Sequence, residues 1–177
     1  MKRLISITTA VVLCSALSFV VVCVAGPPKT ITMEGKWSGT TTATPGCADP
    51  VGGLGFTAES VGMGVLSHFG LTTWVGDSMC LIALGPAASY PDYAQVFQGY
   101  GTATIITAKG EEIYLLTHFT FIGMPGLDFL WAQDIDVANG TGRFENAGGH
   151  VHSTGVGKSN SDGTGSWEGT SSGTITY

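Results

Sequence analysis

The feature that most constrains this fold is a period of two in its apolar residues. From Ile31 to Ser38 every second residue is apolar or glycine, and the residues between them are polar. Successive side chains of a β-strand point to opposite faces, so this spacing predicts a strand with one buried face. Similar segments recur along the chain with turn residues between them. The expected strands cover 31–44, 61–75, 80–84, 97–108, 112–123, 127–137, 150–156 and 167–177, with 61–75 as one long bent strand or a tight pair.

Glycine is abundant, with 27 residues, and amphipathic helical spacing is lacking throughout the sequence. Short strands with turns at near-regular intervals are typical of a sandwich or an up-and-down barrel. Glycines inside strands relieve crowding where a sheet coils strongly, which favours the barrel. The sequence therefore predicts an all-β, eight-stranded antiparallel barrel, with residues 46–58 as an irregular loop over one mouth.

Residues 1–25 have the pattern of a secretory signal peptide. Two basic residues precede an apolar run that ends at Val24, and small residues stand just before Gly26. This pattern predicts cleavage after Ala25. An uncleaved anchor is the alternative, since about 20 apolar residues can span a bilayer. We expect residues 26–177 to form one domain of a secreted or periplasmic protein that has no membrane contact after cleavage.

The charge and the cysteines limit the partners and the covalent links. Cleavage would leave five basic residues against thirteen acidic ones, and a negative chain is a poor ligand for nucleic acid. Cys47 and Cys80 are the two cysteines outside the signal segment. An oxidising compartment would allow them to form a disulfide. The alternative is a buried free Cys80 and an exposed Cys47 in a loop.

Two of the expected strands are apolar on both faces. Segments 112–123 and 127–131 place large apolar residues at successive positions, whereas a barrel wall needs only its inner face apolar. The outer face therefore needs a cover. A second copy of the chain is the preferred cover, which predicts a homo-oligomer; a terminal segment or the 46–58 loop is the alternative.

A glycine-rich segment separates the strands expected at 127–137 and 150–156. Its glycines allow a tight corner between the two strands, and its two apolar residues can fill the space there. The residues concerned are Gly140, Gly142, Phe144, Ala147 and Gly149.

This Gly-x-Gly-x-Phe-x-x-Ala-x-Gly run resembles the allene oxide cyclase barrel superfamily, which also includes plant dirigent proteins. Glu145, directly after the Phe, is similar to the cyclase version. Two further stretches are similar to small exported bacterial members: Gly99 to Ala103 with the turn at Lys109 to Glu111, and the closing segment from Gly165 to Ile175. The resemblance covers about Gly99 to Tyr177. It implies an eight-stranded antiparallel barrel that often packs as a dimer or trimer.

In the cyclases the resemblance implies a cavity that holds an apolar substrate beside a Glu and an ordered water. Glu34 alternates with the apolar residues of its strand and should face outward, so we do not assign it that role. We predict instead that the barrel binds a small apolar ligand in its lumen. A cyclase-type isomerase is one alternative, and a self-associating structural protein with a filled barrel is another. The candidate lumen residues are Trp37, Phe69, Trp74, Phe119 and Trp131.

His150 and His152 lie two apart, as do Asp134 and Asp136 in the neighbouring expected strand. A transition-metal site needs three or four such ligands to converge on one point. Polar residues facing water explain the same pattern. We therefore expect no metal site and no cofactor.

Overall fold

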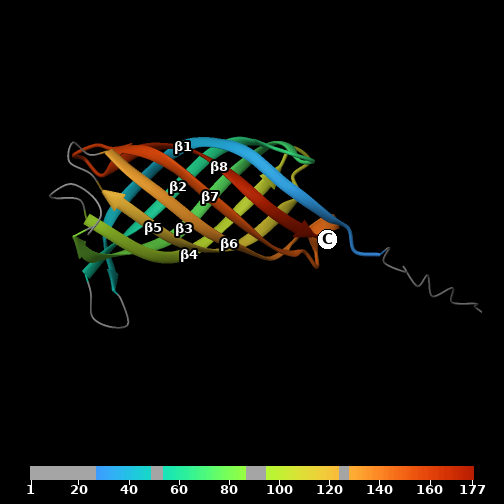
Figure 1. The fold of residues 1–177 in the computed structure, drawn as a ribbon, viewed down its shortest axis with the longest axis horizontal. Helices are drawn as coiled ribbons and strands as arrows, with labels where there is room; N and C mark the ends of the chain where they lie inside the picture. Colours follow the sequence, from blue (N-terminus) through green and yellow to red (C-terminus); the bar gives the residue numbers. More distant parts are fainter. Residues whose placement is uncertain (1–26, 49–53, 87–94, 124–127) are drawn as a thin grey trace, which may run out of the picture.

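The computed structural model describes residues 27–48, 54–86, 95–123 and 128–177, and these form a closed barrel (Figure 1). Each strand pairs antiparallel with the next along the chain, and the last pairs with the first. The expected all-β, eight-stranded antiparallel barrel is confirmed. The strands are β1 (Thr30–Ala48), β2 (Leu54–Leu66), β3 (Gly70–Pro86), β4 (Gln95–Thr107), β5 (Glu112–Gly123), β6 (Asp128–Gly140), β7 (Gly148–Ser159) and β8 (Thr164–Thr176).

The strands are longer than the sequence pattern predicts. The expected 46–58 loop is wrong for most of its length, because β1 runs to Ala48 and β2 begins at Leu54. Pairing between β1 and β2 continues past a bulge at Gly46, where the backbone has a φ of 134°. The segment 61–75 is a pair of strands, joined by a turn at 67–69. Pairing with a neighbouring strand thus keeps residues in β-structure even where their local sequence predicts a turn.

The wall of the barrel separates an apolar lumen from a mixed outer surface. In β5, Ile113 and Leu115 are buried, whereas Tyr114 and Leu116 are exposed. The same alternation runs along the other strands. Buried side chains therefore meet inside one closed wall, which is the arrangement that an eight-stranded barrel of this size requires.

The half of the lumen nearest the β6–β7 connection is solid, and we call it the filled half. Its buried residues form one cluster with Met33, Ile105, Ile113 and Ile175 at 2% exposure or less. The void between them measures about 10 Å³. One buried water needs roughly 10–15 Å³ by this measure, so this half has no room for a ligand.

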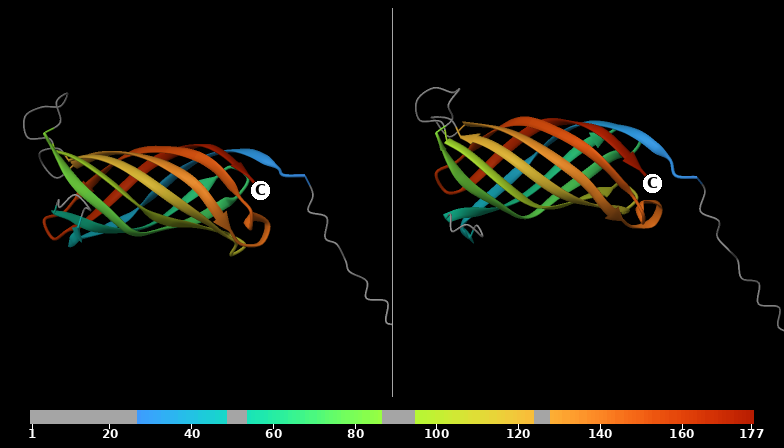
Figure 2. Two further views of the ribbon diagram at one scale, coloured as in Figure 1. Left: turned by 90° about the horizontal axis from the view of Figure 1, so that it is seen from below. Right: turned by 60° about the horizontal axis from the view of Figure 1, so that its bottom comes forward.

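The glycine-rich segment closes this end of the barrel. It forms a short 3-10 helix, η1 (Gly142–Phe144), which begins with a φ of 60° at Gly142. Phe144 is completely buried and packs edge-on against Phe69 and Tyr177, with ring centroids 5.5 and 4.9 Å away. The C-terminus lies at the same end (Figures 1 and 2). Phe144 thus acts as a plug in the filled half.

Arg143 covers this plug from outside. Its guanidinium carbon lies 4.7 Å from the Phe144 ring centroid, and its Nε lies 3.1 Å from a Glu111 carboxylate oxygen. A cation over an aromatic face is weakly favourable at an exposed site. The side chain of Ala147 is also buried, whereas Gly149 has a φ of 148° that favours glycine.

A disulfide between Cys47 and Cys80 is present, with 5.7 Å between the Cα atoms. It joins β1 to β3, although β2 lies between these strands in the sheet. The bridge passes close to Gly55 of β2, where an added Cβ would lie 2.8 Å from the Cys47 sulfur. Of the two alternatives that the sequence leaves open, the structure contains the disulfide. The Leu81 carbonyl oxygen and the Cys47 sulfur together leave no room for a side chain at position 55.

The first and last strands close the wall over a large sequence distance. Thr30 and Thr176 share a side-chain hydrogen bond although they are 146 positions apart. The N–H groups of Lys29 and Tyr177 each donate to the carbonyl oxygen of the other residue, at 2.7 and 3.0 Å. The β1–β8 ladder therefore runs along the whole length of β8.

Candidate ligand-binding site

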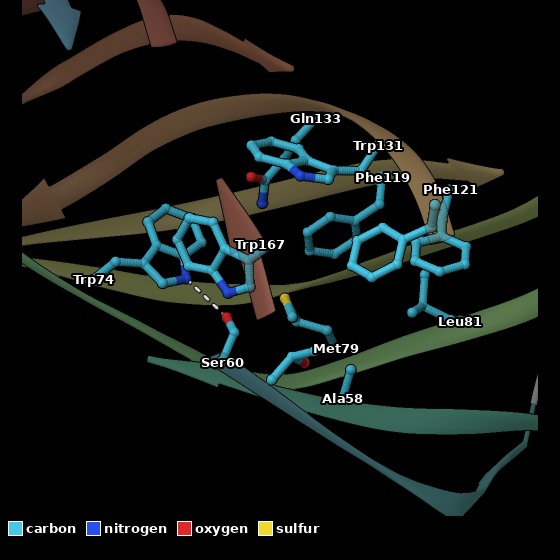
Figure 3. Close-up of a pocket in the computed structure, with 12 residues that line it drawn as sticks. Ala58, Ser60, Trp74, Met79, Leu81, Phe119, Phe121, Trp131, Gln133 and Trp167 are labelled. Carbon is cyan, nitrogen blue, oxygen red and sulfur yellow. Dashed lines mark hydrogen bonds between the residues drawn. The ribbon is translucent and has the colours of Figure 1, made fainter. Parts of the chain in front are cut away.

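The other half of the lumen contains a cavity of about 100 Å³, and we call it the hollow half. This volume is well above what one water molecule needs. The residues around it come from six of the eight strands, β1, β2, β3, β5, β6 and β8, and face a common space (Figure 3). They are Thr41, Ala58, Ser60, Trp74, Met79, Leu81, Phe119, Phe121, Phe129, Trp131, Gln133 and Trp167.

Two tryptophans lie flat against the wall because the neighbouring strands carry glycine. An added Cβ at Gly62 would come within 2.6 Å of the Trp167 ring, and one at Gly155 within 2.5 Å of the Trp131 ring. Each ring thus occupies the place of a missing side chain on an adjacent strand. The two indoles meet edge to face with centroids 6.0 Å apart. Bulky residues therefore line the cavity without filling it.

Hydrogen bonds fix the indole rings that face the cavity. Trp74 Nε1 donates to Ser60 Oγ at 2.9 Å, as Figure 3 shows. Trp167 Nε1 donates to the carbonyl oxygen of Thr40 at 3.2 Å. A buried indole N–H needs such a partner. With these N–H groups engaged, the rings present mainly carbon to the cavity.

Gln133 is the polar exception on the β6 side of the cavity. It lies between Trp131 and Ile135 on β6, and its side chain is only 5% exposed. Its Nε2 atom is buried and has no hydrogen-bond partner among the described residues. Buried polar groups are normally paired, so this amide is an unused hydrogen-bonding group at the wall of an apolar cavity.

The described lining contains no Asp, Glu, His, Lys, Arg, Cys or Tyr. The groups with shifted titration lie on the outer surface instead. The hydrogen bond from His152 lowers the pKa of Asp134, and hydrogen bonds from Thr164 lower the pKa of Asp162. The hydrogen bond between the Tyr114 hydroxyl and Glu112 raises the pKa of Tyr114. The cavity can therefore exclude water and bind apolar surface, but its described lining has no group suited to acid–base catalysis.

The structure separates the five lumen residues named from the sequence. Trp74, Phe119 and Trp131 line the cavity. Trp37 is buried in the filled half, where its Nε1 donates to Ser171 Oγ at 2.9 Å. Phe69 is in the β2–β3 turn and packs on the plug residue Phe144. The last two residues thus lie away from the cavity.

Sequence reasoning missed most of the cavity wall. Phe129 and Gln133 could have been found, because they alternate with Trp131 in one expected strand and must share its face. Trp167 lies in the closing strand, where its alternation with Gly165 and Gly169 gives the same signal. Met79 lies within an irregular stretch of the β3–β4 pairing, between Asp77 and Cys80, so alternation alone could not place it.

The histidine and aspartate pairs lie on the outer surface of β6 and β7. His150 Nδ1 is 2.9 Å from an Asp136 oxygen, and His152 Nδ1 is 2.8 Å from an Asp134 oxygen. All four side chains are more than half exposed. Within the described ranges, no three His, Cys, Asp or Glu residues are placed to hold a metal ion. Glu34 is exposed on β1, away from the lumen.

Comparison with known proteins gives one structural likeness. No protein-family model and no curated protein match the chain. Among solved structures, the pterocarpan synthase dirigent protein GePTS1 matches with a TM-score of 0.43 and 13% identity, over 86% of this chain and 87% of that one. At this TM-score the match carries no functional conclusion, and the barrel is established by its own strand pairing.

No helix within the described part of the chain is long and apolar enough to cross a membrane.

Proposed function

We propose that this protein is a binding protein that takes a small apolar ligand into the hollow half of its barrel. The observation that carries the proposal is the aromatic cavity of about 100 Å³ beside a filled half with a void of only about 10 Å³. Apolar cavities inside proteins stay dry and bind small apolar molecules. A concave, mostly apolar site with a few polar groups is also the usual form of a small-molecule site.

The two alternative functions receive less support. A cyclase-type isomerase needs an ionisable group inside the cavity, and the described lining contains none. A purely structural barrel would be filled along its whole length. Here Trp74 belongs to the filled cluster and also lines the cavity, so the packing ends at this residue. Binding without catalysis therefore fits the hollow half best.

Export forms part of the proposal. The signal-type segment 1–25 lies outside the described residues, so its cleavage after Ala25 stays a prediction. The Cys47–Cys80 disulfide supports it independently, because disulfides persist mainly in oxidising compartments. Mass spectrometry of protein recovered from the medium or periplasm tests this directly. A chain that still carries residues 1–25 would contradict it.

We also propose that the barrel self-associates, through an apolar patch on β2 and β3 rather than through the segments 112–123 and 127–131 named from the sequence. Val61, Met63, Val65 and Leu71 are all more than half exposed there, and Val65 is paired with Leu71. Adjacent exposed apolar residues of this kind often mark protein–protein contacts. Sedimentation should give an oligomer for the wild type and a monomer for Val65→Lys with Leu71→Lys. Thr42→Lys, on the polar outer face of β1, is the control, and a monomeric wild type would contradict the proposal.

Ligand binding can be tested with a cavity-filling variant. Ala58 is 4% exposed at the cavity wall, so Ala58→Leu should occupy part of the space. Thr42→Leu adds similar apolar bulk to the outer face and serves as the matched control. Ligand-observed NMR with α-methylstyrene should show binding to the wild type and to the control, and weakened binding to Ala58→Leu. Equal binding by all three proteins would place the ligand outside the lumen.

A further inference from the structure

Gln133 stands at the boundary between the two halves of the lumen. The inward-facing residues next to it on β6 are Trp131 and Ile135. Trp131 lines the cavity, and Ile135 belongs to the filled cluster. Across the sheet it is paired with Phe119 on β5 and Ser153 on β7. Gln133 therefore lies at the inner end of the cavity on its side of the barrel.

Three serines near this boundary have hydrogen-bond partners, whereas the amide of Gln133, which lines the cavity, has an unpartnered donor. Ser153 Oγ and Ser171 Oγ share a hydrogen bond of 2.6 Å, and Ser171 also accepts from Trp37. Across the lumen on β2, Ser60 accepts from Trp74. Figure 3 shows Gln133 beside Trp131, across the cavity from Ser60. An unpaired buried amide is unfavourable unless a ligand supplies the missing acceptor.

From this geometry we infer that the ligand is a small, uncharged, aromatic or conjugated compound with one acceptor oxygen, which receives a hydrogen bond from Gln133 Nε2. The inference rests on the proposed ligand-binding function and specifies the chemistry of its ligand. The aromatic walls favour a flat ring. We assign an acceptor to the ligand because the unpartnered atom of this cavity-lining residue is a donor.

The absence of titratable residues from the described lining excludes charged ligands. A carboxylate, phosphate or ammonium group entering this cavity would lose its water and gain no opposite charge. A carbonyl oxygen loses less on desolvation and recovers it through one hydrogen bond. Aryl ketones and similar carbonyl compounds therefore fit the site better than aryl acids or hydrocarbons.

The test compares three probes of similar shape: acetophenone with a neutral carbonyl, α-methylstyrene with an alkene in its place, and benzoate with a carboxylate. Wild-type protein should bind acetophenone about three- to tenfold more tightly than α-methylstyrene, which is the range expected for one net hydrogen bond. Benzoate should bind more weakly than either neutral probe. Dissociation constants from calorimetry or tryptophan fluorescence give the readout.

Gln133→Met tests the assigned donor, since methionine has similar length and no hydrogen-bonding amide. This variant should bind both neutral probes with nearly equal affinity. Thr117→Val is the matched control, because Thr117 Oγ1 is also buried and unpartnered but does not line the cavity. It should keep the preference for acetophenone. Both variants should remain folded, because each removes an unsatisfied polar atom and preserves side-chain shape.

The outcomes separate the two proposals. If neither neutral probe binds wild-type protein, the ligand-binding function fails. If both bind equally, or if Gln133→Met keeps the preference for acetophenone, binding in the lumen stands and the role of Gln133 is overturned. Tighter binding of benzoate would overturn the exclusion of charged ligands.

Discussion

Both halves of the lumen contain large apolar side chains, yet only one of them is solid. In the filled half, Trp37 lies over Gly64, and aliphatic residues and the plug residue Phe144 occupy the remaining space. In the hollow half, Trp131 and Trp167 also lie over glycines, but the rings leave the centre open. The cavity therefore arises from the direction in which large residues lie, rather than from a lack of large residues.

The largest difference between the halves should appear when one phenylalanine is removed from each. Phe144→Ala should destabilise the protein by about 3–5 kcal/mol, because it opens a cavity in a packed core. Phe119→Ala should have a smaller effect, since one side of this ring already borders empty space. Chemical denaturation measures both losses. Equal losses would mean that the hollow half is packed as tightly as the filled one.

The disulfide should stabilise the protein by an amount of similar order. Cys47 and Cys80 are 33 residues apart, and replacing both with alanine should cost about 2–4 kcal/mol. The loss arises mainly because the unfolded chain gains freedom. Thermal unfolding of the wild type with and without reductant is the measurement. If reductant also destabilised the double variant, another part of the protein would be responsible.

Two glycines on β2 offer a closer comparison. Gly64 lies under Trp37 in the filled half and Gly62 lies under Trp167 in the hollow half. Gly64→Ala should cost about 1–3 kcal/mol through overpacking, since Trp37 is held by Trp74 and by Ser171. Gly62→Ala should cost less, because Trp167 borders the cavity and can shift into it at the expense of its one hydrogen bond to the Thr40 carbonyl oxygen. The shifted ring should weaken ligand binding. If Gly62→Ala lost more stability than Gly64→Ala, the hollow half would have no free space into which Trp167 could move.

The smallest effect concerns pH, which should act on the outer wall and spare the cavity. The hydrogen bond from His152 lowers the pKa of Asp134, so the folded state favours the ionised carboxylate. The resulting stability is present above the ordinary pKa of Asp, near about 4, and is lost as the pH falls through the lower folded value. Asp134→Asn should reduce this dependence slightly, because Asp134 is well exposed. Thermal unfolding of the two proteins across this pH range is the measurement.

Ligand affinity should stay constant between about pH 5 and 8, because the described lining has no group that titrates there. Titration of the neutral probe acetophenone across this range is the measurement. A change in affinity would point to a titratable group that reaches the cavity.

The sequence predicts the barrel well because alternation is a local property that each strand carries by itself. It fails at 46–58, where β1 extends through Pro45 and Gly46 to Ala48 because this part of the strand pairs with the start of β2. For the site, alternation can identify inward residues but not their depth. Trp37 and Trp131 both point inward, yet one is in the filled half and the other lines the cavity. Depth depends on strand register and tilt, which involve residues far apart in the chain.

The closure of β1 by β8 has a consequence for how the chain folds. Apart from β1 and β8, all neighbouring strands are consecutive in the sequence, so their hairpins can form one after another. The edge of β1 that faces β8 stays unpaired until β8 is available, which lies up to 146 positions away in the sequence, and such long-range contacts form slowly. Until then β1 and the newest strand present unpaired edges that can join other chains. We therefore expect aggregation to compete with the last step of folding, and a truncation that removes β8 to be more damaging than its few buried side chains suggest.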